Sequence, residues 1–417
     1  MQSSIGAELL SAREAAERLG IKVDTLYAYV SRGMLESVTV PGSRERRYRA
    51  EDVERFRSSR GERGGPAEAL MPVIGSSICL IEDGRLYYRG RDAVRLAETA
   101  TLEDIADLLW GGELDMNAAT PALSRPLPPP LAGEGGVGAK RGREDRRVSR
   151  GRAETRPQLG LIERCQVRLA MLAADDLAAL DLTRAGVIHT GRAILSALVA
   201  GVGDQSASPQ PVHRRLAIVW GLDDPGADLV RRCLVLLADH ELNASTFVAR
   251  CVASTAATPY AVVSAALSAL SGRRHGGASA RAEALLHEIA ERGEPMAVMA
   301  VRLARDEHIP GLGHPLYPEG DPRARALLAA AAAALPSAQG RIEEAVAAAR
   351  RLTGQHPNVD FALATVTTAL GLPVGAALSL FVVGRSVGWI AHAIEQYETG
   401  TLIRPRARYT GPRPVQS

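Results

Sequence analysis

The feature that most constrains the fold is a run of small and branched residues from Ala238 to Gly277, which reads ADHELNASTFVARCVASTAATPYAVVSAALSALSGRRHGG. Such residues favour helices, which bury their surface by packing closely against other helices. Aromatic residues make up only 4% of the 417-residue chain, so the core cannot be an aromatic-rich sheet. The sequence therefore predicts a mainly α protein, long enough for two or three domains.

The same run carries a histidine near each end, in polar surroundings. His240 lies between Asp239 and Glu241, and His275 follows two arginines and precedes a pair of glycines. Glycine lets the backbone approach a ligand closely. A lone histidine is more often structural than catalytic. Neither segment resembles a packed core, and whether the two histidines are functional depends on the motifs that accompany them.

One apolar stretch, residues 361–384, contains no charged residue and is long enough to span a bilayer. Three threonines and a serine interrupt it, and the sequence Gly371-Leu372-Pro373 should break it into two helices. We therefore interpret the two halves as buried core helices, bracketed by Asp360 and Arg385.

The first sixty residues have a different character. Ser11 with Glu14 three residues later is typical of a capping box at a helix start, and a second helix is expected over 23–30. Two short strands over 38–48 and a closing helix over 50–56 should follow. This pattern resembles the winged helix-turn-helix of the MerR and excisionase type.

If this module binds DNA, two groups of side chains should make the contacts. The resemblance places Lys22, Thr25 and Tyr27 in the major groove, and the wing near phosphates. The candidate wing residues are Arg44, Arg46 and Arg47. Residues 1–63 contain almost as many acidic as basic residues, whereas dedicated DNA readers are more basic. The alternative is a packing or protein-interaction module.

A second unusual segment, residues 124–156, is rich in proline, glycine and arginine and poor in aliphatic residues. Such a composition cannot form a core and is typical of a disordered loop. We interpret it as an exposed insertion. The four cysteines are far apart with no metal-ligand spacing, and no secretory signal opens the sequence, so we expect a cytoplasmic protein without a metal site.

Further motifs lie downstream of the two histidines. His314 lies on a Gly/Pro loop, and Asp360 lies at the start of an apolar helix, where its carboxylate could serve only as a cap. The segments follow one another as HELNAST, RHGGAS, GLGHPLYPEGDPRA, HPNVDFA and GRSVGWIAHAIEQ. In this order they closely resemble the citrate synthase family, from about Pro72 to Gly411 with one interruption.

The resemblance implies an acyltransferase of the tricarboxylic acid cycle that condenses acetyl-CoA with oxaloacetate and hydrolyses the thioester. No cofactor is implied, because acetyl-CoA is a co-substrate. Asp360 would be the base, His275 would donate a hydrogen bond to the developing enol oxygen, and His314 would polarise the ketone. His240 would hold the oxo acid.

Arginines should bind the two carboxylates of that acid, since the guanidinium fork binds a carboxylate through two hydrogen bonds. The family's positions fall on Arg323, Arg385 and Arg404, the last supplied by the partner subunit of a homodimer. An isolated surface ion pair is the alternative for each arginine. The chain departs from the family pattern at Pro315 and Pro318, where basic residues could otherwise hold CoA phosphates, and at three further places. These are Ser279 in place of the usual Asn, Arg274 before the histidine, and the insertion.

The implied architecture is a large helical domain, residues 67–277 and 356–417, with a smaller domain, 278–355, that closes over the substrate. Two other functions stay open. A 2-methylcitrate synthase would use propionyl-CoA, and one methylene changes binding by only about 1–3 kcal/mol. A DNA-binding regulator would use the citrate-synthase-like domain as a metabolite sensor.

Overall fold

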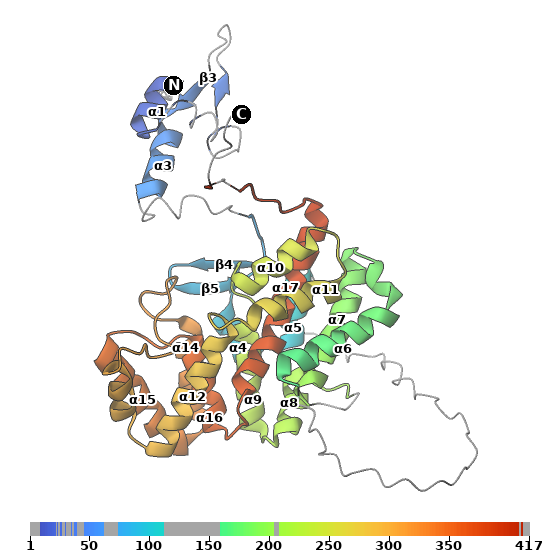
Figure 1. Ribbon diagram of the computed structural model, residues 1–417, viewed down its shortest axis with the longest axis vertical. Helices are drawn as coiled ribbons and strands as arrows, with labels where there is room; N and C mark the ends of the chain where they lie inside the picture. Colours follow the sequence, from blue (N-terminus) through green and yellow to red (C-terminus); the bar gives the residue numbers. More distant parts are fainter. Residues whose placement is uncertain are drawn as a thin grey trace, which may run out of the picture. The chain divides into compact units, whose positions relative to one another are not determined.

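The structure, a computed structural model, forms two compact units, residues 1–75 and 76–417. The described residues of the chain are mainly helical, as predicted (Figure 1). The residues that the structure describes are 9–21, 23, 26, 30, 35, 37–39, 46–61, 74–111, 159–203, 208–407 and 410–411.

The N-terminal unit combines a small antiparallel sheet, of strand order β1-β3-β2, with helices. Its elements are β1 (Leu9–Ser11), α1 (Ala12–Arg18), β2 (Val38–Thr39), β3 (Arg46–Arg49) and α3 (Ala50–Gly61). The predicted capping box is confirmed, because Ser11 Oγ accepts from Glu14 N and the Glu14 carboxylate accepts from Ser11 N. The predicted strand pair is confirmed too, with β2 antiparallel to β3.

A separate apolar core holds this unit together, and it includes the fully buried side chains of Ala15, Leu26, Tyr48 and Val53. Most of the predicted second helix, 23–30, lies outside the described residues, as does the insertion 124–156. Of the candidate DNA contacts, Arg46 and Arg47 lie on β3. The other candidates lie outside the described residues; they are Lys22, Thr25, Tyr27 and Arg44.

The second unit starts with an antiparallel sheet of order β4-β5-β6 and continues almost entirely in helices. Its strands are β4 (Cys79–Glu82), β5 (Arg85–Tyr88) and β6 (Arg91–Asp92). Its first helices are α4 (Ala93–Thr99), α5 (Leu102–Trp110), α6 (Leu161–Asp175), the 3₁₀ helix η2 (Leu177–Leu180), α7 (Arg184–Val202), α8 (Val212–Trp220) and α9 (Asp224–Leu237). The remaining helices are α10 (Ala244–Ala253), α11 (Pro259–Leu270), α12 (Gly276–Arg292), α13 (Pro295–Leu303), α14 (Pro322–Ala334), α15 (Pro336–Thr353), α16 (Val359–Ala369) and α17 (Ala376–Thr399).

The run that dominates the sequence, Ala238 to Gly277, is not one continuous helix. It forms α10 and α11, separated by a turn in which Ala256 takes a positive φ of 59°. Pro259 occupies the first turn of α11, where its missing N–H costs no hydrogen bond. The two helices pack against each other and both pack on α17.

The predicted break in the apolar stretch 361–384 is confirmed, because α16 ends at Ala369 and α17 begins at Ala376. Arg385 lies inside α17 rather than at its end, since the helix continues to Thr399. Among the described helices, α7 and α17 are long and apolar enough to cross a membrane. The most apolar window of α17 is 94% buried within the protein, as expected of a core helix.

Four helices, α12, α13, α15 and α16, enclose a second apolar core beside the main one. In Figure 1, α12, α14, α15 and α16 gather on the opposite side of the unit from α6, α7 and α8. The predicted smaller domain, 278–355, covers most of this region, and its boundaries stay a prediction.

Two glycines allow α17 to approach the end of α9 more closely than a larger residue would permit. A Cβ atom at Gly384 would lie 2.9 Å from the carbonyl oxygen of Leu234. A Cβ atom at Gly388 would overlap the carbonyl oxygen of Ala238 and the carboxylate of Asp239. Because these neighbours are backbone and a fully buried side chain, they cannot move aside without disturbing the helix pair.

We predict that Gly388→Ala lowers the free energy of unfolding by about 1–3 kcal/mol through overpacking. The matched control is Gly340→Ala on α15, where a Cβ atom meets nothing within 4 Å. This control should gain about 0.5–1 kcal/mol, because alanine loses less backbone entropy in a helix. Urea unfolding of both variants measures the difference. Equal stability of the two variants would show that the close approach of α17 to α9 is not required.

Candidate active site

His275 lies at the N-cap position of α12, directly after the turn that ends α11. Its Nε2 atom is 2.8 Å from Ser245 Oγ on α10, and its ring packs edge-on against Phe381 at 5.7 Å between centroids. The same hydroxyl also contacts Asn243 Oδ1 at 2.9 Å and accepts from Trp389 Nε1 at 3.3 Å. The other ring nitrogen of His275, Nδ1, is therefore left for a ligand.

His314 lies on the predicted loop, which two glycines with positive φ, Gly311 and Gly313, bend sharply. Its Nδ1 atom accepts a hydrogen bond from the Leu316 N–H at 3.2 Å. An accepting Nδ1 leaves the proton of a neutral imidazole on Nε2. His314 can thus present an N–H donor to a ligand.

His240 and Tyr317 join this histidine in an aromatic cluster. The ring centroids of His240 and His314 are 5.1 Å apart, and His240 Nε2 is 3.1 Å from the Tyr317 hydroxyl. His240 is only 6% exposed, so the expectation that it lies outside a packed core was wrong. The loop that carries it is held by Tyr88, whose hydroxyl donates to the carbonyl oxygens of Val235 and Asp239 at 3.0 and 3.3 Å.

Asp360 lies in the first turn of α16, and the helix is capped by Asn358, whose Oδ1 accepts from Asp360 N at 3.0 Å. The carboxylate therefore is not needed as the helix cap. Its Oδ1 atom instead accepts a hydrogen bond from the hydroxyl of Ser279 on α12. Burial raises the pKa of Asp360 above its ordinary value, while the hydrogen bond from Ser279 lowers it.

Arg323 is almost fully buried and forms a two-pronged ion pair with Asp321. The Nε and Nη2 atoms of Arg323 lie 3.0 and 2.8 Å from the two carboxylate oxygens. Burial lowers the pKa of Arg323, but the Asp321 carboxylate more than offsets this and holds the pKa above its usual range. Asp321 also accepts from Val359 N at 3.0 Å, which fixes α14 to the start of α16.

Arg385, in the middle of α17, is buried but only partly satisfied. Its Nε donates to the Leu237 carbonyl at 2.7 Å, and its guanidinium lies 4.8 Å from the centre of the Phe381 ring. Its Nη1 atom has no hydrogen-bond partner within the described part of the chain. Burial lowers the pKa of Arg385, and the nearby Asp239 opposes this. A buried donor without a partner is costly, so this guanidinium is suited to an anionic ligand.

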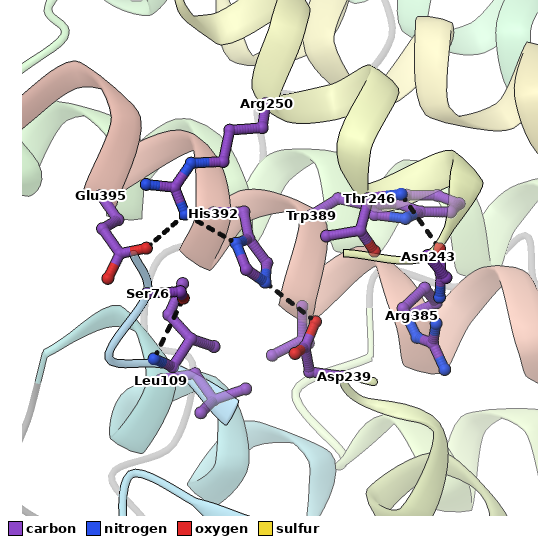
Figure 2. Close-up of polar contacts among 12 residues, drawn as sticks. Ser76, Leu109, Asp239, Asn243, Thr246, Arg250, Arg385, Trp389, His392 and Glu395 are labelled. Atoms are coloured by element: carbon purple, nitrogen blue, oxygen red, sulfur yellow. Dashed lines mark hydrogen bonds and ion pairs between the residues drawn. The ribbon is translucent and has the colours of Figure 1, made fainter. Parts of the chain in front are cut away.

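A series of polar side chains extends from Asp239 through His392 and Arg250 to Glu395 (Figure 2). His392 Nε2 lies 3.4 Å from Asp239 Oδ1, and His392 Nδ1 lies 3.3 Å from Arg250 Nη1. Arg250 in turn donates to Glu395 at 2.5 Å, and Glu395 accepts from Ser77 N at 2.7 Å. This series joins α10 and α17 to the segment before β4, behind the proposed ligand site.

Burial, with a smaller contribution from the arginines, keeps the three histidines neutral. Burial lowers the pKa of His275 to about 4, and Arg385 contributes. Burial and Arg323 also lower the pKa of His314, and burial with both arginines holds that of His240 well below its ordinary value. Neutral imidazoles at pH 7 can donate one hydrogen bond without adding charge beside the arginines.

The structure thus brings together six of the seven predicted residues of the site. Tyr317 contacts His240, His314 and Arg323, while Phe381 contacts His275 and Arg385. Arg323 connects through Asp321 to the N-terminus of the helix that carries Asp360. Arg404 is exposed beyond α17, where no partner chain is present to test its predicted role. Pro315 and Pro318 are exposed on the His314 loop.

Four residues of the site were not predicted from the sequence. Ser245 lies within the motif HELNAST, and Tyr317 and Asp321 lie within GHPLYPEGDPRA. Their presence in the same motifs as His240 and His314 is the sequence feature from which they could have been predicted. Ser279 was noted only as a departure from the family. Its contact with Asp360 connects residues 81 positions apart.

Comparison with known proteins agrees with this geometry. A model of the citrate synthase C-terminal domain matches residues 69–406, and a model of a helix-turn-helix domain matches residues 9–61. The chain is 32% identical over 352 residues to a citrate synthase of Haloferax volcanii, covering 79% of this chain and 90% of that protein. It is 30% identical over 385 residues to a 2-methylcitrate synthase of Mycobacterium tuberculosis, covering 83% and 90%.

The solved structures give the same result. The crystal structure of citrate synthase from Thermotoga maritima superposes with a TM-score of 0.63 at 27% identity, covering 84% of this chain and 96% of that one. The predicted fold and the N-terminal module are both confirmed. The chain belongs to the citrate synthase family, and it is an acyltransferase of that type with a helix-turn-helix domain at its N-terminus.

Proposed function

We propose that this protein condenses acetyl-CoA with oxaloacetate to give citrate and CoA, without a metal or a bound cofactor. One observation carries the proposal. Two buried guanidiniums, Arg323 and Arg385, adjoin neutral histidines and the half-buried Asp360, and Arg385 has an unused donor. A small dicarboxylate would satisfy that donor and balance the charge of Arg385, whereas Asp321 already balances Arg323.

In this proposal, Asp360 removes a proton from the α-carbon of the acyl group. The negative charge then passes to the thioester oxygen, where His275 donates a hydrogen bond. This role requires Nδ1 of His275 to carry the proton. The Ser245 hydroxyl would then turn its one hydrogen from Asn243 Oδ1 to His275 Nε2. The α-carbon of the resulting enolate attacks the ketone carbon of oxaloacetate. The Nε2–H of His314 polarises the ketone oxygen and would supply the proton that the resulting alkoxide takes up.

The remaining residues bind and orient the oxo acid. Arg323 and Arg385 would each hold one carboxylate, and His240, fixed by Tyr317, would contact the same molecule. Arg404 of the partner subunit would complete the site in a homodimer. Hydrolysis of the thioester by water then releases CoA, and we propose that the protein acts in the cytoplasm.

Acetyl-CoA is the proposed acyl donor, and propionyl-CoA is the alternative. The relatives named above include both a citrate synthase and a 2-methylcitrate synthase, at 32% and 30% identity. The distinguishing experiment measures release of free CoA from purified protein with oxaloacetate and either thioester. A higher kcat/KM with acetyl-CoA supports the proposal, and a higher value with propionyl-CoA overturns the choice of donor.

The assigned base gives a sharper prediction. Asp360→Asn keeps the shape of the side chain but removes the proton acceptor, so turnover should fall by about two to three orders of magnitude. Oxaloacetate should still bind, because the two arginines are unchanged, and calorimetric titration measures this. Near-normal turnover in Asp360→Asn would contradict the proposed mechanism.

A second proposed function concerns the N-terminal unit, because a helix-turn-helix family model matches it and β3 presents two arginines. We predict saturable binding to DNA from the upstream region of its own gene. The affinity should fall with salt, since phosphate contacts release counterions. The double variant Arg46→Ala, Arg47→Ala should bind more weakly and reduce the salt slope by about 2.

The matched control is Arg341→Ala, Arg350→Ala, which removes the same charge from exposed positions on α15 in the second unit. Fluorescence titration at two salt concentrations, with and without oxaloacetate, compares the three proteins. If no DNA fragment binds even at low salt, the N-terminal unit has a packing or protein-interaction role. DNA binding together with no CoA release would favour the metabolite-sensing regulator.

A further inference from the structure

Ser279 is buried at 1% exposure and reaches the side chain of Asp360 from a different helix. Its hydroxyl donates to Asp360 Oδ1, and this is the only side-chain hydrogen bond to that carboxylate within the described part of the chain. A hydrogen bond to an ionised acceptor is stronger than one between neutral groups. The contact therefore restricts the rotation of the carboxylate.

The position of Ser279 on α12 couples it to His275. His275 is the N-cap of α12, and Ser279 lies four residues later, about one helical turn. Residues with this spacing share one face of a helix. The first turn of α12 thus carries both the proposed enol donor and the side chain that holds the proposed base.

The backbone of Asp360 is fixed independently. Asn358 caps α16, and Asp321 accepts from Val359 N at 3.0 Å. The main chain at Asp360 thus has little freedom, and the carboxylate can still turn about its side-chain bonds. The hydrogen bond from Ser279 removes that freedom at Oδ1 and leaves Oδ2 for another contact.

We propose that Ser279 is a positioning residue, whose hydroxyl holds Oδ1 of Asp360 so that Oδ2 takes the proton from the acyl α-carbon. This inference rests on the proposed role of Asp360 as the base. The hydroxyl exchanges no proton with the substrate. It fixes the direction of the Asp360 carboxylate relative to His275, because Ser279 lies on α12 and His275 is the N-cap of the same helix.

The hydroxyl also affects the charge state of the base. Burial raises the pKa of Asp360, and Ser279 opposes this by stabilising the ionised form. The charged groups that face Asp360 from the neighbouring helices are Arg323 and Asp321 on α14 and Arg385 on α17. The arginines lower its pKa and Asp321 raises it, and none of them depends on Ser279.

The test is the pH dependence of kcat for Ser279→Ala, Ser279→Cys and Ser279→Thr. The base works only when ionised, so kcat falls as the pH drops through the pKa of Asp360. Loss of the donor raises that pKa, and the acid limb of Ser279→Ala should move up by about one pH unit. The plateau kcat should fall about tenfold, because the base is less well oriented.

The other two variants separate hydrogen bonding from packing. Cysteine keeps the shape with a weak donor, and it should behave like alanine. Threonine keeps the hydroxyl and should restore the acid limb of the wild-type enzyme. KM for oxaloacetate should change little in every variant, since no arginine is altered.

The control is Thr365→Val, which removes another buried hydroxyl from α16. Thr365 donates to the Phe361 carbonyl and not to Asp360, so this variant should lose stability without moving the acid limb. An acid limb that stays in place in both Ser279→Ala and Ser279→Cys would overturn the inference and leave Asp360 as the base. Full turnover in Asp360→Asn, measured in parallel, would overturn both the proposed function and the inference.

Discussion

The burial of two guanidinium groups, Arg323 and Arg385, within electrostatic reach of each other is the constraint on which the rest of this structure depends. A buried cation is costly unless other groups compensate it. Arg323 lowers the pKa of Arg385, and both arginines lower the pKa of Asp360. Arg323 is compensated by Asp321 within hydrogen-bonding distance. Within the described part of the chain, Arg385 has the Leu237 carbonyl, the Phe381 ring and the electrostatic effect of Asp239, while its Nη1 has no hydrogen-bond partner. Its compensation is therefore incomplete without a ligand.

The two buried arginines also influence the protonation of the histidines and of Asp360. The histidines stay neutral because burial, together with the positive charge of the arginines, lowers their pKa values, and neutral rings can still donate a hydrogen bond. Asp360 lies close enough to both arginines to be stabilised as a carboxylate, yet burial keeps its pKa raised. A base with a raised pKa accepts a proton more readily than an exposed carboxylate does.

The sequence allowed prediction of features that depend on neighbouring residues. The capping box at Ser11, the helix break near Pro373 and the start of α16 at Asp360 all follow from local rules. The ordered motifs, through the family resemblance, also identified the six residues that converge. His240 was misjudged as lying outside the core, because its polar sequence neighbours do not show that β5 and the His314 loop cover it.

Contacts between distant residues could not be predicted in this way. Ser245 and His275 are 30 positions apart, and Ser279 and Asp360 are 81 positions apart. Each pair depends on how helices pack, and periodicity within one helix does not determine which helix lies opposite. The Ala/Ser-rich run was predicted to be helical but its division into α10 and α11 was not predicted, since Pro259 can start a helix as well as interrupt one.

The packing of α17 explains why several residues of the motif GRSVGWIAHAIEQ contact the segments that carry His240 and His275. Residues spaced by three or four positions share a helix face, and the face that includes Arg385, Gly388, Trp389 and His392 is directed at α9 and α10. Gly388 lets the backbone of Ala238 lie close to α17, and Arg385 donates to the Leu237 carbonyl. The indole of Trp389 donates to Ser245, which contacts His275. A rotation of α17 about its axis would move all these contacts together. The helix therefore acts as a common support, and the two histidines at the ends of the Ala238–Gly277 run have their positions set by the same surface.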